Sequence, residues 1–534
     1  MHKIGNIYFI AAIAVIGGAL FGFDISSMSA IISTQPYLCT FNQLGTDENG
    51  LCRGPKADVQ GGITAAMPGG SWLGALISGF LSDRFGRKMS IQIGAVIWVV
   101  GSVVVCASVN IPMLAVGRLV NGFSVGICSA QVPVYISELA PPTKRGRLVG
   151  FQQWAITWGI LIMFFICYGS SFLKGTAAFR LPWGLQAIPA VLLYAGLMFL
   201  PESPRWLAKQ DHWDQAKDVL VLVHGHGDPD SLLVKKEMED IRAVVEFERA
   251  NADVSYFELV KPKMLNRTVI GVFTQIWSQL TGMNVMMYYI TYVFTMAGLA
   301  DADGNAVLLP AGIQFIINVA LTVPALLYID IWGRRPTLLA GASLMCLFLS
   351  LTAALLALYS RPARPGEFPS ASESMAISGA PAKAVIACTY LFVATFAATW
   401  GPVSWTYPSE LFPLRVRGKA VALCTSANWA FNFALAYFVP PALVNIRWGT
   451  YVLFAGFCAV MGAHVWAMFP ETANKTLEEV GRIFEGEGEG AIKYIGTPAW
   501  RTKNTRAKAL ESEGAVVQRD DAAAVSSGLE TEKA

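Results

Sequence analysis

The sequence predicts an all-α membrane protein with twelve transmembrane helices, arranged as two pseudo-symmetric six-helix bundles with a cytosolic helical linker between them. Composition is the first reason: the chain has 534 residues, 54% hydrophobic and only 14% charged, and a mean hydropathy of +0.47. Soluble globular proteins are much less apolar. The net charge of +3 is small and dispersed, so we predict no nucleic-acid partner.

Twelve apolar stretches are the second reason. A crossing of the bilayer takes roughly 20 apolar residues. Lipid offers backbone amides no partner, so each crossing must be a helix, which satisfies them internally. We place the stretches near 8–32, 62–82, 91–109, 112–136, 148–171, 183–200, 268–297, 308–331, 337–359, 383–407, 419–443 and 448–469, six on each side of a polar break.

The third reason is a duplication. The phrase ELAPPTKRGR at 138–147 returns as ELFPLRVRGK at 410–419, and both follow a long apolar stretch. Two further pairs keep the same order: DRFGRK at 83–88 with DIWGRR at 330–335, and PESPRW at 201–206 with PETANK at 470–475. Paired six-helix halves usually hold a site between them near the bilayer midplane, and their rocking exposes it alternately to each side. This architecture predicts transport rather than catalysis.

The polar segments divide the chain into four parts. We expect an N-terminal bundle at 1–200, a cytosolic helical linker at 201–265, a C-terminal bundle at 266–470 and a cytosolic tail at 471–534. The linker contains KEMEDIRAVVEFERA, which has helical spacing with its charges on one face. Beyond about residue 485 the tail is charged and poor in aromatic residues, so we expect it to be disordered.

Short loops rich in lysine and arginine set the orientation. They face the cytosol by the positive-inside rule, and both termini face it with them. Cys39 and Cys52 lie in the polar loop after the first helix, which this topology places outside, where oxidation is permitted. A disulfide between them is possible there, but spacing alone does not establish it.

The sequence carries no signature of an enzyme, a cofactor or a metal site. It has no nucleophile paired with a base, no phosphate-binding loop and no dinucleotide fingerprint. His224 and His226 are close together, but neither has an acidic or cysteine partner at zinc-like spacing. We interpret their segment as a solvated loop.

Several motifs together resemble the sugar porter branch of the major facilitator superfamily, most closely fungal high-affinity hexose transporters, over residues 5 to 485. They are GGALFGFD in the first helix, GRLVNGFSVG in the fourth, PESPRWL after the sixth, QLTGMNVMMYY in the seventh and PET after the twelfth. The resemblance implies the major facilitator fold and import of a glucose-like monosaccharide. We expect a monomer in the lipid of the plasma membrane.

A sugar is a ring of hydroxyls around an apolar face, so a site for it within the membrane needs neutral amides and an aromatic plane. Amides occur inside otherwise apolar helices at Gln152, Gln153, Gln275, Gln279, Asn284, Gln314, Asn318, Asn428 and Asn432. The alternative for each is a hydrogen bond that only fastens two helices together. By resemblance, the sugar-contacting positions are Gln153, Gln279, Asn284, Asn318, Trp405 and Asn428.

One position departs from the family pattern. Many relatives carry two adjacent glutamines in the seventh helix, whereas this chain has Ser278 before Gln279. The expected pocket therefore has one amide fewer. The preferred sugar stays open between a hexose, a larger or less hydroxyl-rich sugar, a polyol and a disaccharide.

Two charges lie deep in apolar helices, Asp24 in the first and Arg118 in the fourth. Ionisable groups inside a membrane are costly and mark function by default. We predict that Asp24 takes a proton when Arg118 moves away, which couples proton and sugar. By resemblance, proton-coupled sugar porters carry this acid and this arginine. Three alternatives remain: a permanent salt bridge between helices, a facilitative uniporter and a sugar sensor that does not transport.

Charged residues repeat at the cytosolic edge of both halves. We predict that they form pairs between the halves, which hold the inner face shut. Topology marking by positive charge is the alternative, but it explains the arginines and not the repeated acids. The predicted gate residues are Asp83, Arg87, Glu138, Arg145, Glu202, Asp330, Arg334, Glu410, Arg417 and Glu471.

Overall fold

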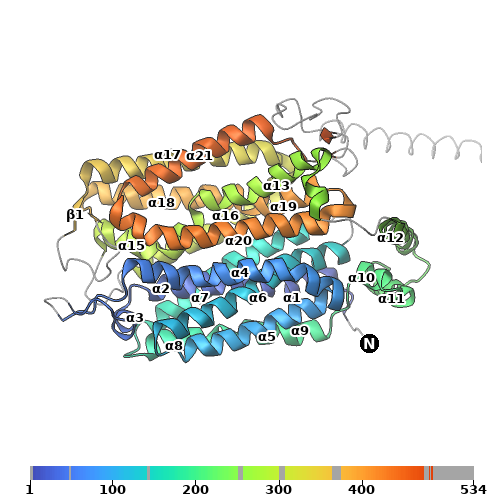
Figure 1. Ribbon diagram of the computed structural model, residues 1–534, viewed down its shortest axis with the longest axis horizontal. Coiled ribbons are helices and arrows are strands. Elements are labelled where there is room, and N and C mark those ends of the chain that lie inside the picture. The colour runs from blue at the N-terminus through green and yellow to red at the C-terminus, as the bar shows by residue number, and fades with distance from the viewer. Residues whose placement is uncertain are drawn as a thin grey trace, which may run out of the picture.

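The computed structural model describes residues 4–46, 50–140, 145–225, 227–250, 256–299, 307–363, 375–473, 480 and 483–484. Its helices form two bundles that lie side by side, the N-terminal half in blue to cyan and the C-terminal half in yellow to orange (Figure 1). The predicted fold class is confirmed. The disorder predicted for the tail concerns residues outside the described part of the chain.

The N-terminal half begins with a broken helix, α1 and α2, and ends with another, α8 and α9. Between them lie a short helix, α3, and four long ones. The bounds are α1 Ile7–Ala14, α2 Ile16–Ile31, α3 Gln35–Thr40, α4 Ala57–Phe85, α5 Arg87–Cys106, α6 Ile111–Leu139, α7 Arg145–Ser170, α8 Ala177–Leu185 and α9 Ala187–Met198.

The C-terminal half starts with a helix broken into pieces and continues with long helices. A two-stranded antiparallel ribbon of β1 and β2 lies at the end of α17. The bounds are α13 Pro262–Leu280, α14 Met283–Tyr288, α15 Ile290–Phe294, η3 Thr295–Leu299, α16 Leu308–Trp332, α17 Arg334–Tyr359, β1 Arg361–Pro362, β2 Met375–Ala376, α18 Ala380–Ala398, α19 Trp400–Leu411, α20 Leu414–Asn445 and α21 Gly449–Met468.

Nine spans in the described residues are long and apolar enough to cross a membrane by length and hydropathy alone. The other three predicted crossings correspond to α4, α20 and the broken α13 to α15, which lie among the nine (Figure 1). Helices α4 and α20 pack against each other along the boundary between the halves. A helix that faces protein on several sides keeps more polar and small residues than one that faces lipid, which explains their lower hydropathy.

The linker consists of α10 Pro204–Lys209, α11 Trp213–Val223, α12 Leu232–Ala250 and the short η2 Tyr256–Val260. Helices α10 to α12 lie at the same end of the bundles as the N-terminus (Figure 1). The solvated loop expected at His224 is wrong: the residue is buried, and its Nε2 lies 3.0 Å from the carbonyl oxygen of Leu139 at the end of α6. This contact joins the end of α11 to the end of α6, and the ring is buried between them. His226 is outside the described residues.

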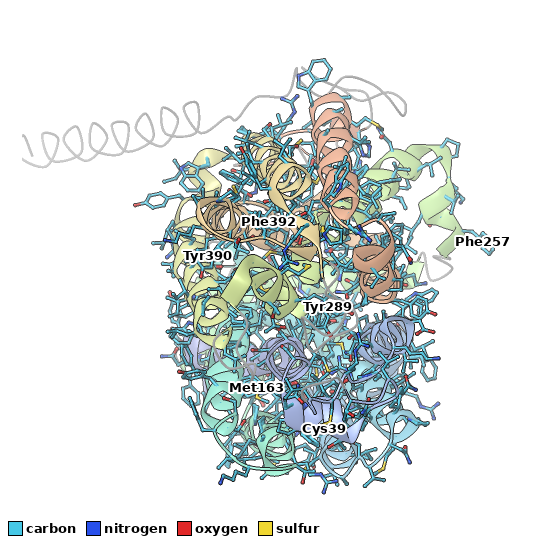
Figure 2. All side chains as sticks on the ribbon, turned by 90° about the vertical axis from the view of Figure 1, so that its left-hand side faces the viewer. Cys39, Met163, Phe257, Tyr289, Tyr390 and Phe392 are labelled. Carbon is cyan, nitrogen blue, oxygen red and sulfur yellow. A yellow bond between two sulfur atoms is a disulfide. The ribbon has the colours of Figure 1, made fainter. Side chains whose placement is uncertain are left out.

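At the opposite end, Cys39 and Cys52 are joined in a disulfide with a Cα–Cα distance of 5.0 Å. The closed loop holds α3 against the N-terminal half, where the ring of Tyr37 packs edge-on to Trp183 at 6.4 Å. Figure 2 looks at this end and shows Cys39 on the N-terminal half and Tyr289 near the boundary between the halves.

Candidate functional site

Asp24 of α2 and Arg118 of α6 form a bidentate ion pair in the interior of the N-terminal half. Arg118 Nη2 lies 2.9 Å from Asp24 Oδ2, and its Nη1 lies 3.3 Å from Oδ1. Both residues are only 1% exposed. The guanidinium also donates to two backbone carbonyls of α4, from Nε to Ile63 at 2.9 Å and from Nη2 to Thr64 at 3.4 Å. The pair is thus fully satisfied and shielded from solvent.

Aromatic residues of the C-terminal half approach this pair. Tyr288 of α14 is buried and interacts electrostatically with Asp24, and its hydroxyl has no hydrogen-bond partner among the described residues. Thr291 of α15 donates to the backbone carbonyl of Ser29 at 3.3 Å, which links α15 to α2. The α14 to α15 segment therefore contacts the helix that carries Asp24.

Three of the predicted sugar-contacting amides meet in one hydrogen-bonded chain. Gln279 of α13 donates from Nε2 to Asn428 Oδ1 of α20 at 2.6 Å and accepts from Asn284 Nδ2 of α14 at 2.6 Å. Its Nε2 also lies 3.4 Å from Ser278 Oγ, so a hydroxyl takes part where many relatives carry an amide. Gly282, in the left-handed conformation at φ 83°, separates α13 from α14 and allows Gln279 and Asn284 to face each other.

The other three predicted positions lie on three separate helices, and no hydrogen bond joins them to this chain in the part of the protein that the structure describes. Gln153 of α7 faces α19, since its Nε2 lies 3.5 Å from the position of a Cβ added at Gly401. Asn318 of α16 is 3% exposed, and Trp405 of α19 is half-buried.

Trp429 is an interior residue that the sequence analysis missed. It is fully buried in α20 and crosses to the N-terminal half in two ways. Its ring packs edge-on against Phe21 of α2 with centroids 4.8 Å apart, and its Nε1 donates to Ser129 Oγ of α6 at 3.2 Å. In the sequence, the signal that could have identified Trp429 is its position directly after Asn428, a predicted sugar-contacting residue.

Two of the nine intramembrane amides fasten helices together instead. Gln152 Nε2 donates to the carbonyl of Ser129 at 3.3 Å, and Gln275 Nε2 donates to the carbonyl of Ser404 at 2.9 Å. Each therefore has a backbone partner on a neighbouring helix. For these two residues the helix-fastening alternative describes the observed contacts.

The charged residues predicted as the gate in the N-terminal half form one network, at the end of the bundle where α5 begins and α6 ends. Arg87 lies bidentate on Glu138, with Nε 3.0 Å from Oε2 and Nη2 3.1 Å from Oε1. Ser203 donates its hydroxyl to the same carboxylate. Glu202 Oε1 accepts the backbone N–H groups of Arg87 at 3.0 Å and Lys88 at 3.1 Å, which caps the start of α5.

The C-terminal half repeats this network residue for residue. Arg334 Nη2 lies 2.6 Å from Glu410 Oε1, and Thr472 Oγ1 donates to Glu410 Oε2 at 2.6 Å. Glu471 accepts the backbone N–H groups of Arg334 at 2.9 Å and Arg335 at 3.1 Å, at the start of α17. The duplicated sequence motifs therefore make the same contacts in both halves.

For four of the predicted gate residues, the observed pairs lie within one half and not between the halves. Arg87 with Glu138 and Arg334 with Glu410 each pair within one half, because a short loop places the arginine beside the end of the acid's helix. Asp83 pairs with Lys209 at 3.7 Å on an exposed surface, and Arg417 donates to the carbonyl of Phe412. The side chains of Arg145 and Asp330 lie outside the described part of the structure.

Burial raises the pKa of the Glu202 carboxyl above the usual glutamate value. The backbone N–H groups of Ser203 and Lys88, together with the charge of Arg87, act in the opposite direction. At this position, desolvation destabilises the charged carboxylate more than the hydrogen bonds stabilise it. The cap on α5 is therefore sensitive to protonation.

Comparisons with known proteins agree with this arrangement. The family model described as Sugar (and other) transporter matches residues 10–484. The MFS glucose transporter mfs1 of Aspergillus flavus is 44% identical over 529 residues, which are 97% of this chain and 95% of that protein. The high-affinity glucose transporter of Kluyveromyces lactis is 44% identical over 508 residues, 93% of this chain and 87% of that protein.

Among solved structures, the proton:xylose symporter XylE bound to 6-bromo-6-deoxy-D-glucose is similar with a TM-score of 0.72. The two chains are 28% identical, and the match covers 90% of this chain and 99% of that one. The resemblance seen in the sequence motifs is confirmed. The chain belongs to the sugar transporter family of the major facilitator superfamily.

Proposed function

We propose that this sugar transporter imports a glucose-like hexose across the plasma membrane by alternating access, in symport with protons. In this proposal Asp24 carries the proton, Arg118 controls its release, and both termini face the cytosol. The protein works as a monomer, since each chain holds both the amide cluster and the ion pair. The observation that carries the coupling is the bidentate pair of Asp24 and Arg118, each 1% exposed.

The amide chain supports a hydroxyl-rich, neutral substrate. Gln279, Asn284 and Asn428 bond to one another at 2.6 Å, and a sugar hydroxyl both donates and accepts, so it can replace either of these bonds. The ring faces of Trp405 and Trp429 suit the apolar face of a pyranose. Relatives named as glucose transporters make glucose the first substrate to test.

Coupling follows from the cost of an unpaired buried charge. Removal of one partner from a buried ion pair typically costs about 3 to 5 kcal/mol. A proton on Asp24 neutralises the acid and frees Arg118 to move, so protonation and a change of helix packing favour each other. The contact of α15 with α2 through Thr291 and Ser29 places the segment that follows Asn284 against the helix of Asp24.

The test is uptake in a host that lacks its own hexose carriers. Radiolabelled glucose should accumulate, sugar addition should make the medium more alkaline, and a protonophore should abolish accumulation. Asp24→Asn should lose the alkalinisation at normal surface level. Asp58→Asn, the same change at an exposed acid in the first turn of α4, is the matched control and should keep it.

Each alternative gives a different outcome. Uptake without alkalinisation, insensitive to the protonophore, identifies a facilitative uniporter. No uptake of any sugar despite surface expression identifies a sensor. Competition of labelled glucose by pentoses, polyols and disaccharides then defines the substrate that Ser278 permits.

A further inference from the structure

Five of the prolines inside the described helices share one structural consequence. Proline has no N–H, so it leaves the carbonyl four residues earlier without its helical partner. A neighbouring side chain must then satisfy that oxygen within the membrane. Each of the five freed carbonyls accepts a side-chain donor from outside its own helix. The pairs are Thr64 from Arg118, Ser129 from Gln152, Ala178 from Ser170, Ser404 from Gln275 and Ala436 from Tyr289, ahead of Pro68, Pro133, Pro182, Pro408 and Pro440.

One of these five donors is charged. Arg118 Nη2 donates to the Thr64 carbonyl that Pro68 frees, at 3.4 Å, and Nε donates to the adjacent carbonyl of Ile63 at 2.9 Å. The guanidinium therefore has acceptors on two sides, the carboxylate of Asp24 and the backbone of α4. We call these two carbonyl oxygens, of Ile63 and Thr64, the α4 carbonyl pair.

Further buried groups form a hydrogen-bonded chain that ends on the side chain of Thr64. Tyr37 donates its hydroxyl to Gln60 Oε1 at 3.0 Å, and Gln60 Nε2 lies 3.4 Å from Thr64 Oγ1. The titratable groups of the described residues that interact with Asp24 or Arg118 are Tyr37 from α3, Tyr288 from α14 and Tyr289. None of these phenols carries charge near neutral pH, so Arg118 is the cation that faces Asp24.

We propose that Pro68 makes the α4 carbonyl pair a second docking position for Arg118, which holds the guanidinium while Asp24 is protonated. This inference rests on the proposed proton symport. When Asp24 binds a proton, Arg118 loses its ionic partner and moves further onto the acceptors on α4, where the 3.4 Å contact with Thr64 shortens. The carbonyls therefore stabilise the protonated state more than the charged one. Because the protonated state of Asp24 then costs less free energy, Asp24 binds its proton at a higher pH. Pro68 is thus a positioning residue for coupling.

Pro68→Ala tests this, because alanine returns an N–H that competes with Arg118 for the Thr64 carbonyl. The full-length protein is expressed in the carrier-free host, and radiolabelled glucose uptake is measured across external pH. We expect the pH of half-maximal uptake to fall by roughly 0.5 to 1 unit. The KM for glucose at saturating proton concentration should stay unchanged, whereas a merely structural defect lowers uptake equally at every pH.

Pro182→Ala is the matched control, since it removes a proline that frees a carbonyl for the uncharged Ser170, and its pH midpoint should equal that of the unaltered protein. Pro68→Ser returns the same N–H and replaces Pro68→Ala if the latter does not reach the cell surface. A pH midpoint that is unchanged or raised overturns the inference. If Asp24→Asn retains sugar-evoked alkalinisation, the proposed symport is wrong. If Asp24→Asn loses it but the Pro68 variants keep the pH midpoint of the unaltered protein, only the second docking position is wrong.

Discussion

Glu202 and Glu471 occupy the same position in the two halves: each places its carboxylate on the first two backbone N–H groups of a membrane helix. Glu202 caps α5 through Arg87 and Lys88, and Glu471 caps α17 through Arg334 and Arg335. A negative group is favourable at a helix N-terminus, where four N–H groups lack intrahelical partners. The PES and PET motifs of the sequence are therefore helix caps supplied from a distant segment.

The first prediction concerns these caps. Glu471→Ala should lower the stability of the protein in detergent by about 1 to 3 kcal/mol, because two N–H groups lose a charged acceptor. Thermal unfolding followed by tryptophan fluorescence measures the change. Glu239→Ala, at an exposed position of α12, is the control and should leave the transition in place. Equal behaviour of the two variants contradicts the capping role.

The second prediction concerns the glycines that precede the caps. Gly86 and Gly333 have φ of 89° and 82°, and a Cβ added there lies 2.5 Å from Glu202 Oε2 and 2.7 Å from Glu471 Oε2. Gly333→Ala should therefore destabilise the fold by roughly 1 to 3 kcal/mol through backbone strain and displacement of the carboxylate.

The control for this change is Gly456→Ala in the middle of α21, where an added Cβ meets nothing within 4 Å. Alanine there removes the backbone entropy cost of glycine, so a gain of up to about 1 kcal/mol is expected. Thermal unfolding compares the two variants. A Gly333→Ala protein as stable as Gly456→Ala argues against the positional requirement.

The third prediction follows from the raised pKa of Glu202. A carboxyl that binds its proton more tightly in the folded protein contributes stability below its unfolded pKa and loses it as pH rises through its folded pKa. The melting temperature of the unaltered protein minus that of Glu202→Gln should therefore fall as pH rises above about 4, the ordinary range of a glutamate. A difference that grows with pH shows that the charged form is favoured instead.

The fourth prediction separates two glutamines one turn apart on α13. Gln279→Ala should raise the KM for glucose by roughly 10- to 100-fold, since a sugar loses one or two hydrogen bonds with the amide chain. Gln275→Ala leaves the carbonyl of Ser404 without its donor, so it should lower thermal stability and keep the KM within about threefold. Uptake kinetics corrected for surface level provide the comparison, and similar KM values for both variants refute the assignment.

The fifth prediction concerns the loop that contains Cys39 and Cys52. The disulfide between Cys39 and Cys52 closes a loop with a sequence separation of 13. Replacement of both cysteines by serine should lower stability by about 2 to 4 kcal/mol, because the unfolded chain gains conformational freedom. Replacement of Cys346 by serine, a free cysteine of α17, is the control. Unchanged thermal unfolding of the double variant shows that other contacts hold the loop.

Much of the fold was predictable because lipid leaves few choices. A long apolar run must be a helix, and three duplicated motifs fixed the two halves. The seventh stretch, 268–297, is predicted as one helix, yet it divides into α13, α14, α15 and η3. Gly282 causes the break between α13 and α14, and hydropathy averaged over a long window does not detect one residue in the left-handed conformation.

The interior charges were also predictable, since Asp24 and Arg118 stand out against apolar helices. The partners of the repeated charges, such as Arg87 and Arg334, were not predictable. A repeated motif identifies the residues but does not show whether they contact their own half or the other half. Gln152 and Gln275 show the same limit, because the sequence does not show toward which neighbouring helix the amide of a helical residue points. Their backbone partners appear only when the helices are packed.

The helix prolines tie together positions that are far apart in the chain. The carbonyl oxygen that Pro133 or Pro408 leaves without a helical partner needs another donor for as long as the proline is present. Replacement of Gln152 or Gln275 alone by an apolar residue is therefore unfavourable. Loss of the proline and loss of the donor are tolerable together and damaging singly. In homologous sequences, the proline and its donor residue should therefore change together. Such covariation between the two positions marks the helix kinks of this protein.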